Sequence, residues 1–507
     1  MYGSTGVPDI SPNTAYLLCI DLGSSSIKTA VCTPNGDIAG RASMTAAYRT
    51  SDLDGDLGMR YDAAETMRRV VACASSSITE SSIGPSQIDG CAITSQRQGL
   101  AVLDEALSPL LLSPNRDLRA VFQGAAIDER IGDLVWSETA HLPSYLGAWA
   151  KLQWLAEEEP ELLRKAAYAL TLSDWLVVEM TGSPTIDASN GVESGLVNVD
   201  SGQYSSALAG EFSFAVNSEI AITTSGSISG ELSESFATAL GVTPGLPVIN
   251  CGPDTQVALA GLGIAAAGDT AVIAGWSCVV QRIMDSPVRD PEHRMWTGRH
   301  VLPDHWVLES NASVMGGAYE WLTGLLYGDD SATDRMDEID ARLSDAASEP
   351  TRSSVHLVPS TVDISRPGLQ FGGIGFPVPM ALDNPDQLDV IRAGLNGFGF
   401  AIKANLARLD SSVGTSDSML AIGGGMIRTS YFTSALATIL DEPLRLGSPD
   451  ASLAGAARMA ADTLGLDSEH FSEQGTIVEP NKSHVSEFSH LYEEWIDRSK
   501  RLSDIPI

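Results

Sequence analysis

The chain has 507 residues, more than one ordinary hydrophobic core can organise, so two large domains of roughly 250 residues each are expected. Hydrophobic residues make up 43 % and charged residues 19 % of the chain, a composition that excludes intrinsic disorder. A formal net charge of −34 disfavours nucleic acid and anionic membranes as partners, because like charges repel. A small anionic ligand would need local attraction from backbone amides or a metal ion.

The six cysteines form no C-x-x-C pair and lie in apolar stretches such as YLLCIDL, which predicts buried free thiols in a reducing compartment. The chain shows neither a signal-peptide pattern nor an apolar run of about 18 residues. A cytoplasmic protein is therefore expected, with residues 1–14 as a flexible extension.

Three strands are predicted at the start of the ordered chain, at residues 15–22, 27–33 and 38–45. The turns GSSS and PNGD separate them, which indicates a three-stranded meander. Further strands and helices follow in the first half: a helix at 63–78, strands at 88–95 and 100–104, and a helical region over 120–179 that is clearest at 151–170.

The second half opens with an apolar strand at 246–252, and residues 269–283 then repeat the strand–turn–strand theme around Gly275. This faint internal repeat predicts two halves of related topology with a boundary near 245–255. The remaining predicted elements are helices at 388–410, 430–441 and 451–465, a strand over 418–426 that runs into a glycine turn, and an amphipathic helix near the C-terminus.

Asp21 ends the first strand, directly before the glycine turn of the DLGSSSIK segment. Backbone amides in such a turn can form a cradle for phosphate, and Gly23 permits the unusual dihedrals. Asp21 would then be placed to hold Mg²⁺ beside the phosphates. The alternative is an ordinary hairpin with a serine-rich turn.

Asp254 follows an apolar strand within the segment GPDTQ, with Gln256 close behind. A carboxylate at the C-terminal end of a strand in an α/β fold faces the usual ligand crevice. It could accept the proton of a substrate hydroxyl that attacks phosphorus. The alternative is a helix N-cap, a position that favours aspartate.

Three glycines at 423–425 lie between an apolar strand and a helix, where they would let a nucleotide approach the backbone or would simply form a turn. The chain has no G-x-x-x-x-G-K-[ST] loop, which disfavours a P-loop enzyme. It also has no H-E-x-x-H motif and no Cys/His cluster with zinc spacing.

Taken in order, these motifs resemble the FGGY family of carbohydrate kinases over about residues 15–465. The resemblance implies an α/β, two-domain, actin-like (ribonuclease H-like) ATPase fold with a central cleft. The segments that carry it are IDLGSSSIK, AITSQRQGLAVLD, NRDLRA, KLQWLAEEEPE, LSDWLVVEMTGSPTIDASN, GPDTQVALAGLG, DVIRAGLNGFGFAI, AIGGGM and DASLAGAA. Four positions depart from the family pattern: Ser24 and Trp276 each replace a threonine, Asn115 replaces an aromatic residue and Asn396 replaces a common glutamate.

The resemblance implies ATP as donor, Mg²⁺ near Asp21 and Asp254 as catalytic base. It implies phosphate contacts from Gly23, Ser24, Ser25, Gly275 and Ser277, adenosine contacts from Gly424 and Gly425, and substrate contacts from Gln96, Arg97, Gln98, Asp117, Asp254 and Gln256. The implied division is an extension at 1–14, an N-terminal kinase domain at 15–250, a C-terminal kinase domain at 251–490 and a tail helix at 491–507.

Trp276 occupies a position in the second phosphate motif, AGWSC, where the family normally carries threonine. An indole cannot donate a hydroxyl hydrogen bond, although Ser277 could take over that role. This departure keeps open an alternative function, a catalytically weak actin-like sensor of sugar or nucleotide. A filament-forming or folding ATPase of the same superfamily is disfavoured by the sugar-type segment AITSQRQG.

The substrate implied by the resemblance is a small sugar or polyol, with no nucleic acid or membrane partner. The sequence RQG at 97–99 lies between the R-E of glycerol kinases and the M-H-G of xylulose kinases, and is similar to the R-E-G of autoinducer kinases. An autoinducer precursor or a pentulose such as xylulose is therefore favoured. Homodimers are common in the family, but no apolar stripe here identifies an interface.

Overall fold

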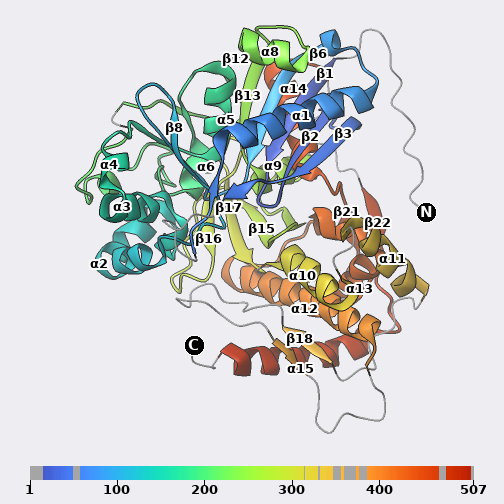
Figure 1. Cartoon of the computed structure of the whole chain (residues 1–507). Coiled ribbons are helices and arrows are strands. Elements are labelled where there is room, and N and C mark those ends of the chain that lie inside the picture. Colours follow the sequence, from blue (N-terminus) through green and yellow to red (C-terminus); the bar gives the residue numbers. More distant parts are fainter. Residues whose placement is uncertain are drawn as a thin grey trace.

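The apolar strands of the chain form two large sheets, seen in the upper and lower halves of Figure 1. This computed structural model describes residues 15–49, 57–217, 219–312, 314–328, 332–345, 355–358, 373–375, 385–467 and 475–503. The predicted extension at 1–14 lies outside the described residues.

The first sheet has six strands in the order β12-β13-β6-β1-β2-β3. Their bounds are β1 Tyr16–Leu22, β2 Ser26–Cys32, β3 Ile38–Thr45, β6 Ile88–Ser95, β12 Ser227–Glu231 and β13 Pro247–Pro253. β1 pairs antiparallel with β2, and β2 pairs antiparallel with β3, which confirms the predicted meander. All seven side chains of β1 are buried, as expected for a central strand covered on both faces.

The second sheet has seven strands in the order β16-β17-β15-β14-β20-β21-β22. Their bounds are β14 Thr270–Ala274, β15 Cys278–Met284, β16 Trp296–Arg299, β17 Trp306–Asn311, β20 Ala421–Gly423, β21 Leu444–Leu446 and β22 Thr476–Val478. The hydrophobic cluster around this sheet includes Val272, Phe398 and Phe432. It is separate from the cluster around the first sheet.

The two sheets share one pairing pattern. β14 is antiparallel to β15 and parallel to β20, just as β1 is antiparallel to β2 and parallel to β6. This confirms the predicted relation between the two halves. The chain leaves the first sheet after Pro253 and enters the second at Thr270, so the predicted boundary at 250 and 251 falls inside β13, where strand pairing continues to Pro253.

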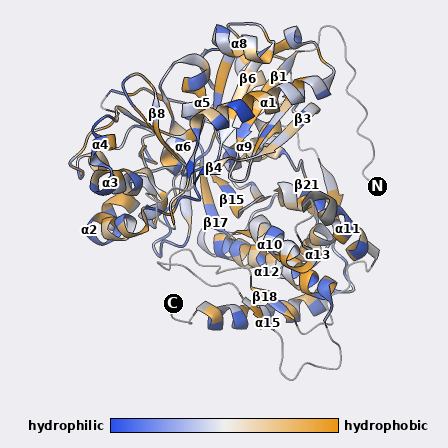
Figure 2. Ribbon diagram, in the orientation of Figure 1, coloured by the Kyte–Doolittle hydropathy of each residue, from blue (hydrophilic) through white to orange (hydrophobic). Residues whose placement is uncertain are grey.

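Helices cover the faces of both sheets. In the first half they are α1 Ala63–Ser81, α2 Val121–Thr139, α3 Ala148–Glu158, α4 Pro160–Leu163, α5 Leu172–Thr181, α6 Ala188–Glu193, α7 Ser206–Ala209 and α8 Glu234–Leu240. In the second they are α9 Asp254–Gly261, α10 Met315–Tyr327, α11 Ala332–Asp345, α12 Gln387–Val413, α13 Ser430–Leu440, α14 Ala451–Leu464 and α15 Val485–Ser503. Figure 2 shows hydrophilic and hydrophobic residues interleaved along α15, as expected of an amphipathic helix.

The predicted helical region over 120–179 is wrong in part. α3 ends at Glu158, and Pro160 begins a separate short helix because it lacks the N–H that a continuing helix would need. Tyr168–Leu170 forms strand β9, which pairs antiparallel with β7 Leu100–Leu103. β7 also pairs with β8 Pro109–Ser113, so these three strands make a small sheet beside the first one.

α14 comes late in the sequence but packs against the first sheet, and Figure 1 shows it beside β6 and β13. Its Leu453, Ala456 and Ala460 share a buried cluster with Leu17 of β1 and Ile249 of β13. α14 thereby ties the end of the chain to the beginning.

All six cysteines are buried free thiols, as predicted. No helix within the described ranges is both long enough and apolar enough to cross a membrane.

Candidate active site

Three parallel strands of the first sheet bring separate predicted site residues to one edge. Asp21 of β1 lies opposite Thr94 of β6, and Thr94 lies opposite Gly252 of β13. Arg97 comes two residues after β6, and Asp254 comes directly after β13, each at the carboxyl end of its strand. The parallel register therefore gathers residues that are more than two hundred positions apart in the chain.

The Asp21 carboxylate is buried and keeps one oxygen without a hydrogen bond. Its Oδ2 accepts a hydrogen bond from Ser452 Oγ at 2.7 Å, whereas Oδ1 has no partner among the described residues. Burial raises the pKa of Asp21. The positive charge of Lys28 and the hydrogen bond from the Ser452 hydroxyl act in the opposite direction, but the net effect is a raised pKa. An unpaired carboxylate oxygen in such a place is suited to a hard cation such as Mg²⁺.

The turn after Asp21 has the features expected of a phosphate cradle. The Gly23 amide donates to the Ser26 carbonyl at 3.0 Å and closes the turn. Within the described residues no hydrogen bond uses the amides of Ser24 or Ser25, so both remain available to an anion. The Ser24 hydroxyl accepts a hydrogen bond from Asn115 Nδ2 at 2.7 Å.

The second turn, at Gly275–Ser277, lies beside the glycine turn at 423–425. β14 and β20 run parallel and end together, and a Cβ on Gly424 would lie 2.6 Å from the Ala274 carbonyl oxygen. Gly424 also has φ of +96°, so both its conformation and its packing require glycine. A Cβ on Gly425 would meet no atom within 4 Å, which leaves open space beside the backbone there.

Asp254 is the first residue of α9 and remains partly exposed. The alternative interpretation as an N-cap is wrong, because Pro253 occupies that position; Asp254 Oδ1 instead accepts from the adjacent Thr255 amide at 2.8 Å. Burial and then the negative charge of Asp21 raise the pKa of Asp254 to about 7, while Arg97 acts in the opposite direction. A carboxylate with this pKa can take a proton near neutral pH.

Arg97 is held by two buried carboxylates. Its guanidinium donates to Glu309 through Nη1 at 2.6 Å and Nη2 at 2.9 Å, and to Glu193 Oε2 through Nη1 at 3.0 Å. Glu193 Oε1 also accepts from Gln256 Nε2 at 2.6 Å. Burial alone would raise the pKa of Glu193, but Arg97 and then His141 lower it to about 2.

Two other predicted substrate contacts are already engaged within the protein. Gln96 donates to Tyr61 Oη at 2.6 Å and accepts from the Asn115 amide at 2.9 Å. Asp117 accepts from Ser113 Oγ at 2.6 Å and from Arg119 Nε at 2.7 Å. Both side chains are buried and order the loop beside the first turn.

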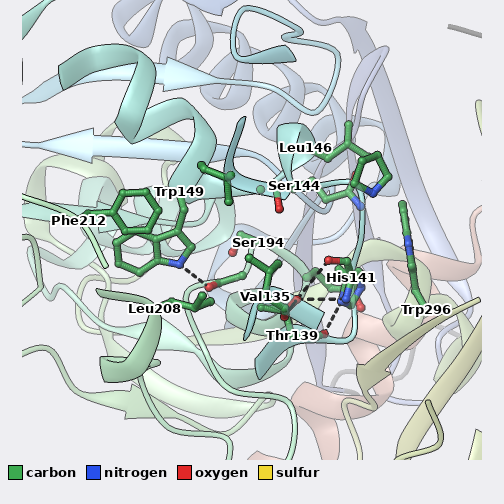
Figure 3. A pocket seen from close by; sticks show the side chains of 16 residues that line it. Val135, Thr139, His141, Ser144, Leu146, Trp149, Ser194, Leu208, Phe212 and Trp296 are labelled. Atoms are coloured by element: carbon green, nitrogen blue, oxygen red, sulfur yellow. Dashed lines mark hydrogen bonds and ion pairs between the residues drawn. The ribbon is translucent and has the colours of Figure 1, made fainter. Parts of the chain in front are cut away.

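Gln98 has a different setting, because it lines a small cavity of about 30 Å³ next to Glu193. Figure 3 shows the aromatic walls of this cavity, with Trp149 and Phe212 at one end and Trp296 beside His141 at the other. Its volume suits water rather than a sugar ring.

Family models match almost the whole described chain. The N-terminal domain of the FGGY family of carbohydrate kinases matches residues 16–261, and the C-terminal domain of that family matches residues 270–463. The chain belongs to the FGGY family of carbohydrate kinases. FGGY kinases are phosphotransferases that act on alcohol groups and use ATP.

Relatives of this FGGY kinase match nearly its whole length. It is 26 % identical over 94 % of its chain, and 95 % of the other, to a putative sugar kinase, YoaC, of Bacillus subtilis. It is 24 % identical over 95 % of its chain, and 93 % of the other, to the autoinducer-2 kinase of Klebsiella pneumoniae. A solved xyloylose kinase of Brucella ovis has a TM-score of 0.80 at 20 % identity over 96 % of this chain and 99 % of that one. The fold is thus the two-domain actin-like fold that the sequence predicted.

The sequence patterns did not indicate Glu193 and Glu309 as site residues of this FGGY kinase. Glu309 lies in the apolar strand WVLESN, and a charged residue in such a strand signals a buried partner. The identity of that partner is a long-range feature, because Arg97 is 212 residues away in sequence.

Proposed function

We propose that this FGGY kinase transfers the γ-phosphoryl group of ATP to a hydroxyl of a small sugar or polyol, with Asp254 as the catalytic base. The observation that carries the proposal is the position of Asp254. Asp254 is the first residue of α9 and lies at the sheet edge that also carries Asp21 and Arg97. Its carboxylate is partly exposed and has a pKa of about 7.

Each group has a defined part in the transfer. Asp254 takes the proton of the substrate hydroxyl while the oxygen of that hydroxyl bonds to the γ-phosphorus. The bond between the γ-phosphorus and the β,γ-bridging oxygen breaks at the same time, which releases ADP. The amides of Ser24 and Ser25 bind phosphate oxygens, with Gly275 and Ser277 on the opposite turn. The open side of Gly425 accepts the adenosine. Most of the rate enhancement comes from positioning and charge neutralisation.

Asp21 would hold Mg²⁺ through its unpaired Oδ1. Within the described residues no group of three or more His, Cys, Asp or Glu side chains is arranged to bind a metal, so phosphate oxygens and water would complete the coordination. When bound there, the ion neutralises phosphate charge.

The proposed substrate class is an autoinducer precursor or a pentulose. The full-length match to autoinducer-2 kinase and the RQG sequence at 97–99 support it. Arg97 and Gln98 are the proposed direct substrate contacts, with Arg97 positioned by Glu193 and Glu309, whereas Gln96, Asp117 and Gln256, which are buried and hydrogen-bonded within the protein, would act through those internal hydrogen bonds. We further propose a cytoplasmic protein, since six buried free thiols suit a reducing compartment, and a homodimer, the common family assembly.

The test is a coupled ADP-release assay on a panel of pentuloses, polyols and autoinducer-2 precursor, with wild type and Asp254→Asn. Loss of the positioned base should lower turnover on the accepted substrate by about 10²–10⁴-fold. Mg-ADP affinity, measured by calorimetry, should remain within about threefold of wild type, because the substitution removes no phosphate contact. Equal turnover by both proteins would exclude Asp254 as the base. Substrate binding without ADP release on any compound would favour the sensor alternative.

A further inference from the structure

Arg116 lies between aromatic rings from the two halves of the molecule. Its guanidinium carbon is 4.8 Å from the ring centroid of Trp276, on the turn after β14, and 5.7 Å from that of Tyr48, in strand β4 Tyr48–Arg49. Both distances are those of cation–π contacts. The side chain therefore bridges the two halves at the level of the predicted phosphate turns.

The loop that carries Arg116 is fixed to the first of those turns. The neighbouring Asn115 donates from its side chain to Ser24 Oγ at 2.7 Å, and the Tyr48 hydroxyl donates to the Ser24 carbonyl. Arg116 is thus held close to the Gly23–Ser25 turn while it stacks against Trp276 of the Gly275–Ser277 turn.

The start of α10 accommodates the Trp276 indole. A Cβ on Gly317 would lie 2.7 Å from Trp276 Nε1, and the Gly317 amide donates to the Trp276 carbonyl at 3.2 Å. The Gly316 amide likewise donates to the Gly275 carbonyl at 3.2 Å. The indole is therefore part of a close-packed turn, with its ring beneath the guanidinium.

Other basic groups of this region already contact carboxylates, although Asp450 is shared by three of them and so neutralises them only in part. Three of them pair with the carboxylate of Asp450: Lys28 at 3.7 Å, Arg41 at 3.2 Å and Arg428 at 3.4 Å. Arg97 pairs with Glu193 and Glu309. In contrast, no carboxylate of the described residues lies within ion-pair distance of Arg116, in a chain whose net charge is −34. A stacked guanidinium retains its in-plane N–H donors, which match phosphate oxygens.

We propose that Arg116, positioned by Trp276, binds the γ-phosphoryl group of ATP between the two turns and supplies the contact that a threonine hydroxyl gives in the usual second phosphate motif. This inference rests on the proposed kinase function and extends it to a residue and a ring that the family pattern does not supply. Arg116 neutralises negative charge on the transferring phosphoryl group, and Trp276 fixes the plane of the guanidinium.

The experiment compares nucleotide affinities in the full-length protein by calorimetry, with Mg²⁺ present and no sugar. AMP-PNP carries the γ-phosphoryl position and ADP lacks it. Arg116→Gln should lower AMP-PNP affinity by about ten- to a hundredfold, the range for a charge-assisted hydrogen bond, and should change ADP affinity by less than about threefold. Arg130→Gln is the matched control, because it removes one positive charge from an exposed ion pair with Glu211. It should change neither affinity.

A second pair of variants tests the positioning role. Trp276→Phe keeps an aromatic face and should retain most of the preference for AMP-PNP over ADP, whereas Trp276→Ala should lose most of it. Arg116→Lys keeps the charge without the planar donor fork and should recover only part of the preference. Thermal unfolding of each variant checks that the fold is intact.

The outcomes separate this inference from the proposed function. If wild type binds Mg-ADP and Mg-AMP-PNP but Arg116→Gln weakens neither, or weakens both equally, Arg116 does not contact the γ-phosphoryl group and only this inference fails. If wild type binds neither nucleotide, the proposed function and this inference both fail.

Discussion

At the scale of single residues, the proposed chemistry depends on two carboxylates, Asp21 and Asp254, that have different surroundings. Asp21 and Asp254 are close enough that the charge of one raises the pKa of the other. Asp21 has an unpaired oxygen suited to a cation, whereas Asp254 is partly exposed and has the pKa of a base. We therefore propose different roles for these two similar side chains, which lie at the same sheet edge in different surroundings.

The raised pKa of Asp254 predicts a pH dependence. The base must be deprotonated to accept the hydroxyl proton, so activity is half-maximal near pH 7, approaches its full value well above pH 7 and falls below it. With Mg-ATP and sugar both well below saturation, where the rate reports the free enzyme, it should fall by about tenfold per pH unit below pH 7. The measurement is the pH profile from 5 to 9. The residual activity of Asp254→Asn should lack this acidic limb, and a wild-type profile that stays flat down to pH 5 would contradict the assignment.

Some site residues were predictable from sequence, and others were not, for a physical reason. Asp21 lies near the end of an apolar strand, and Gly23 and Asp254 directly follow one, so local pattern was enough to place them at strand ends. The pairing of Arg97 with Glu193 and Glu309 depends on contacts across 96 and 212 residues, which local pattern does not encode. The substrate roles of Gln96, Arg97, Gln98, Asp117 and Gln256 remain predictions.

At the scale of elements, apolar runs bounded by turns placed the central strands of both sheets, because burial on both faces leaves a continuous hydrophobic signal. The same approach missed β12, β16, β17, β21 and β22. The error at residues 151–170 arose where a short strand, Tyr168–Leu170, follows a helical pattern without a glycine break. Its conformation depends on pairing with β7, which is distant in the sequence, so the local pattern could not predict it.

The contact between α9 and α14 is an element-scale feature with a measurable consequence. A Cβ on Gly455 would overlap the Val257 carbonyl oxygen, so the two helices approach closely only because that side chain is absent. Gly455→Ala should lower the free energy of unfolding by about 1–3 kcal/mol through overpacking. The measurement is urea unfolding followed by circular dichroism.

The matched control is Gly132→Ala in α2, where a Cβ would meet only Asp128 Cβ at 4.0 Å. That substitution should be neutral or stabilise by up to about 1 kcal/mol, because alanine favours helix over glycine. Equal effects of both substitutions would mean that the approach of α9 and α14 is not close.

At the scale of the whole molecule, the Arg97–Glu309 pair joins the first sheet to β17 of the second. Glu309→Gln should destabilise the protein by about 1.5–3 kcal/mol, because it replaces charge-assisted hydrogen bonds from buried Arg97 by weaker neutral ones, while Glu193 still compensates the charge of Arg97. Glu211→Gln, at an exposed ion pair with Arg130, should cost less than about 1 kcal/mol. Both values come from urea unfolding midpoints. A Glu309→Gln protein as stable as the Glu211→Gln control would show that the pair contributes little to holding the sheets together.

The repeated strand pattern suggests two equivalent halves, but the place of α14 makes them unequal as folding units. A polypeptide cut after residue 261 would contain every strand of the first sheet and yet lack the helix that shields Leu17 and Ile249 from water. Synthesis from the ribosome therefore leaves that apolar surface bare until about residue 464 has emerged, although its strands are complete some two hundred residues earlier. The two similar halves are therefore expected to fold as one unit, because the first sheet is completed only by α14, which lies near the C-terminal end of the chain.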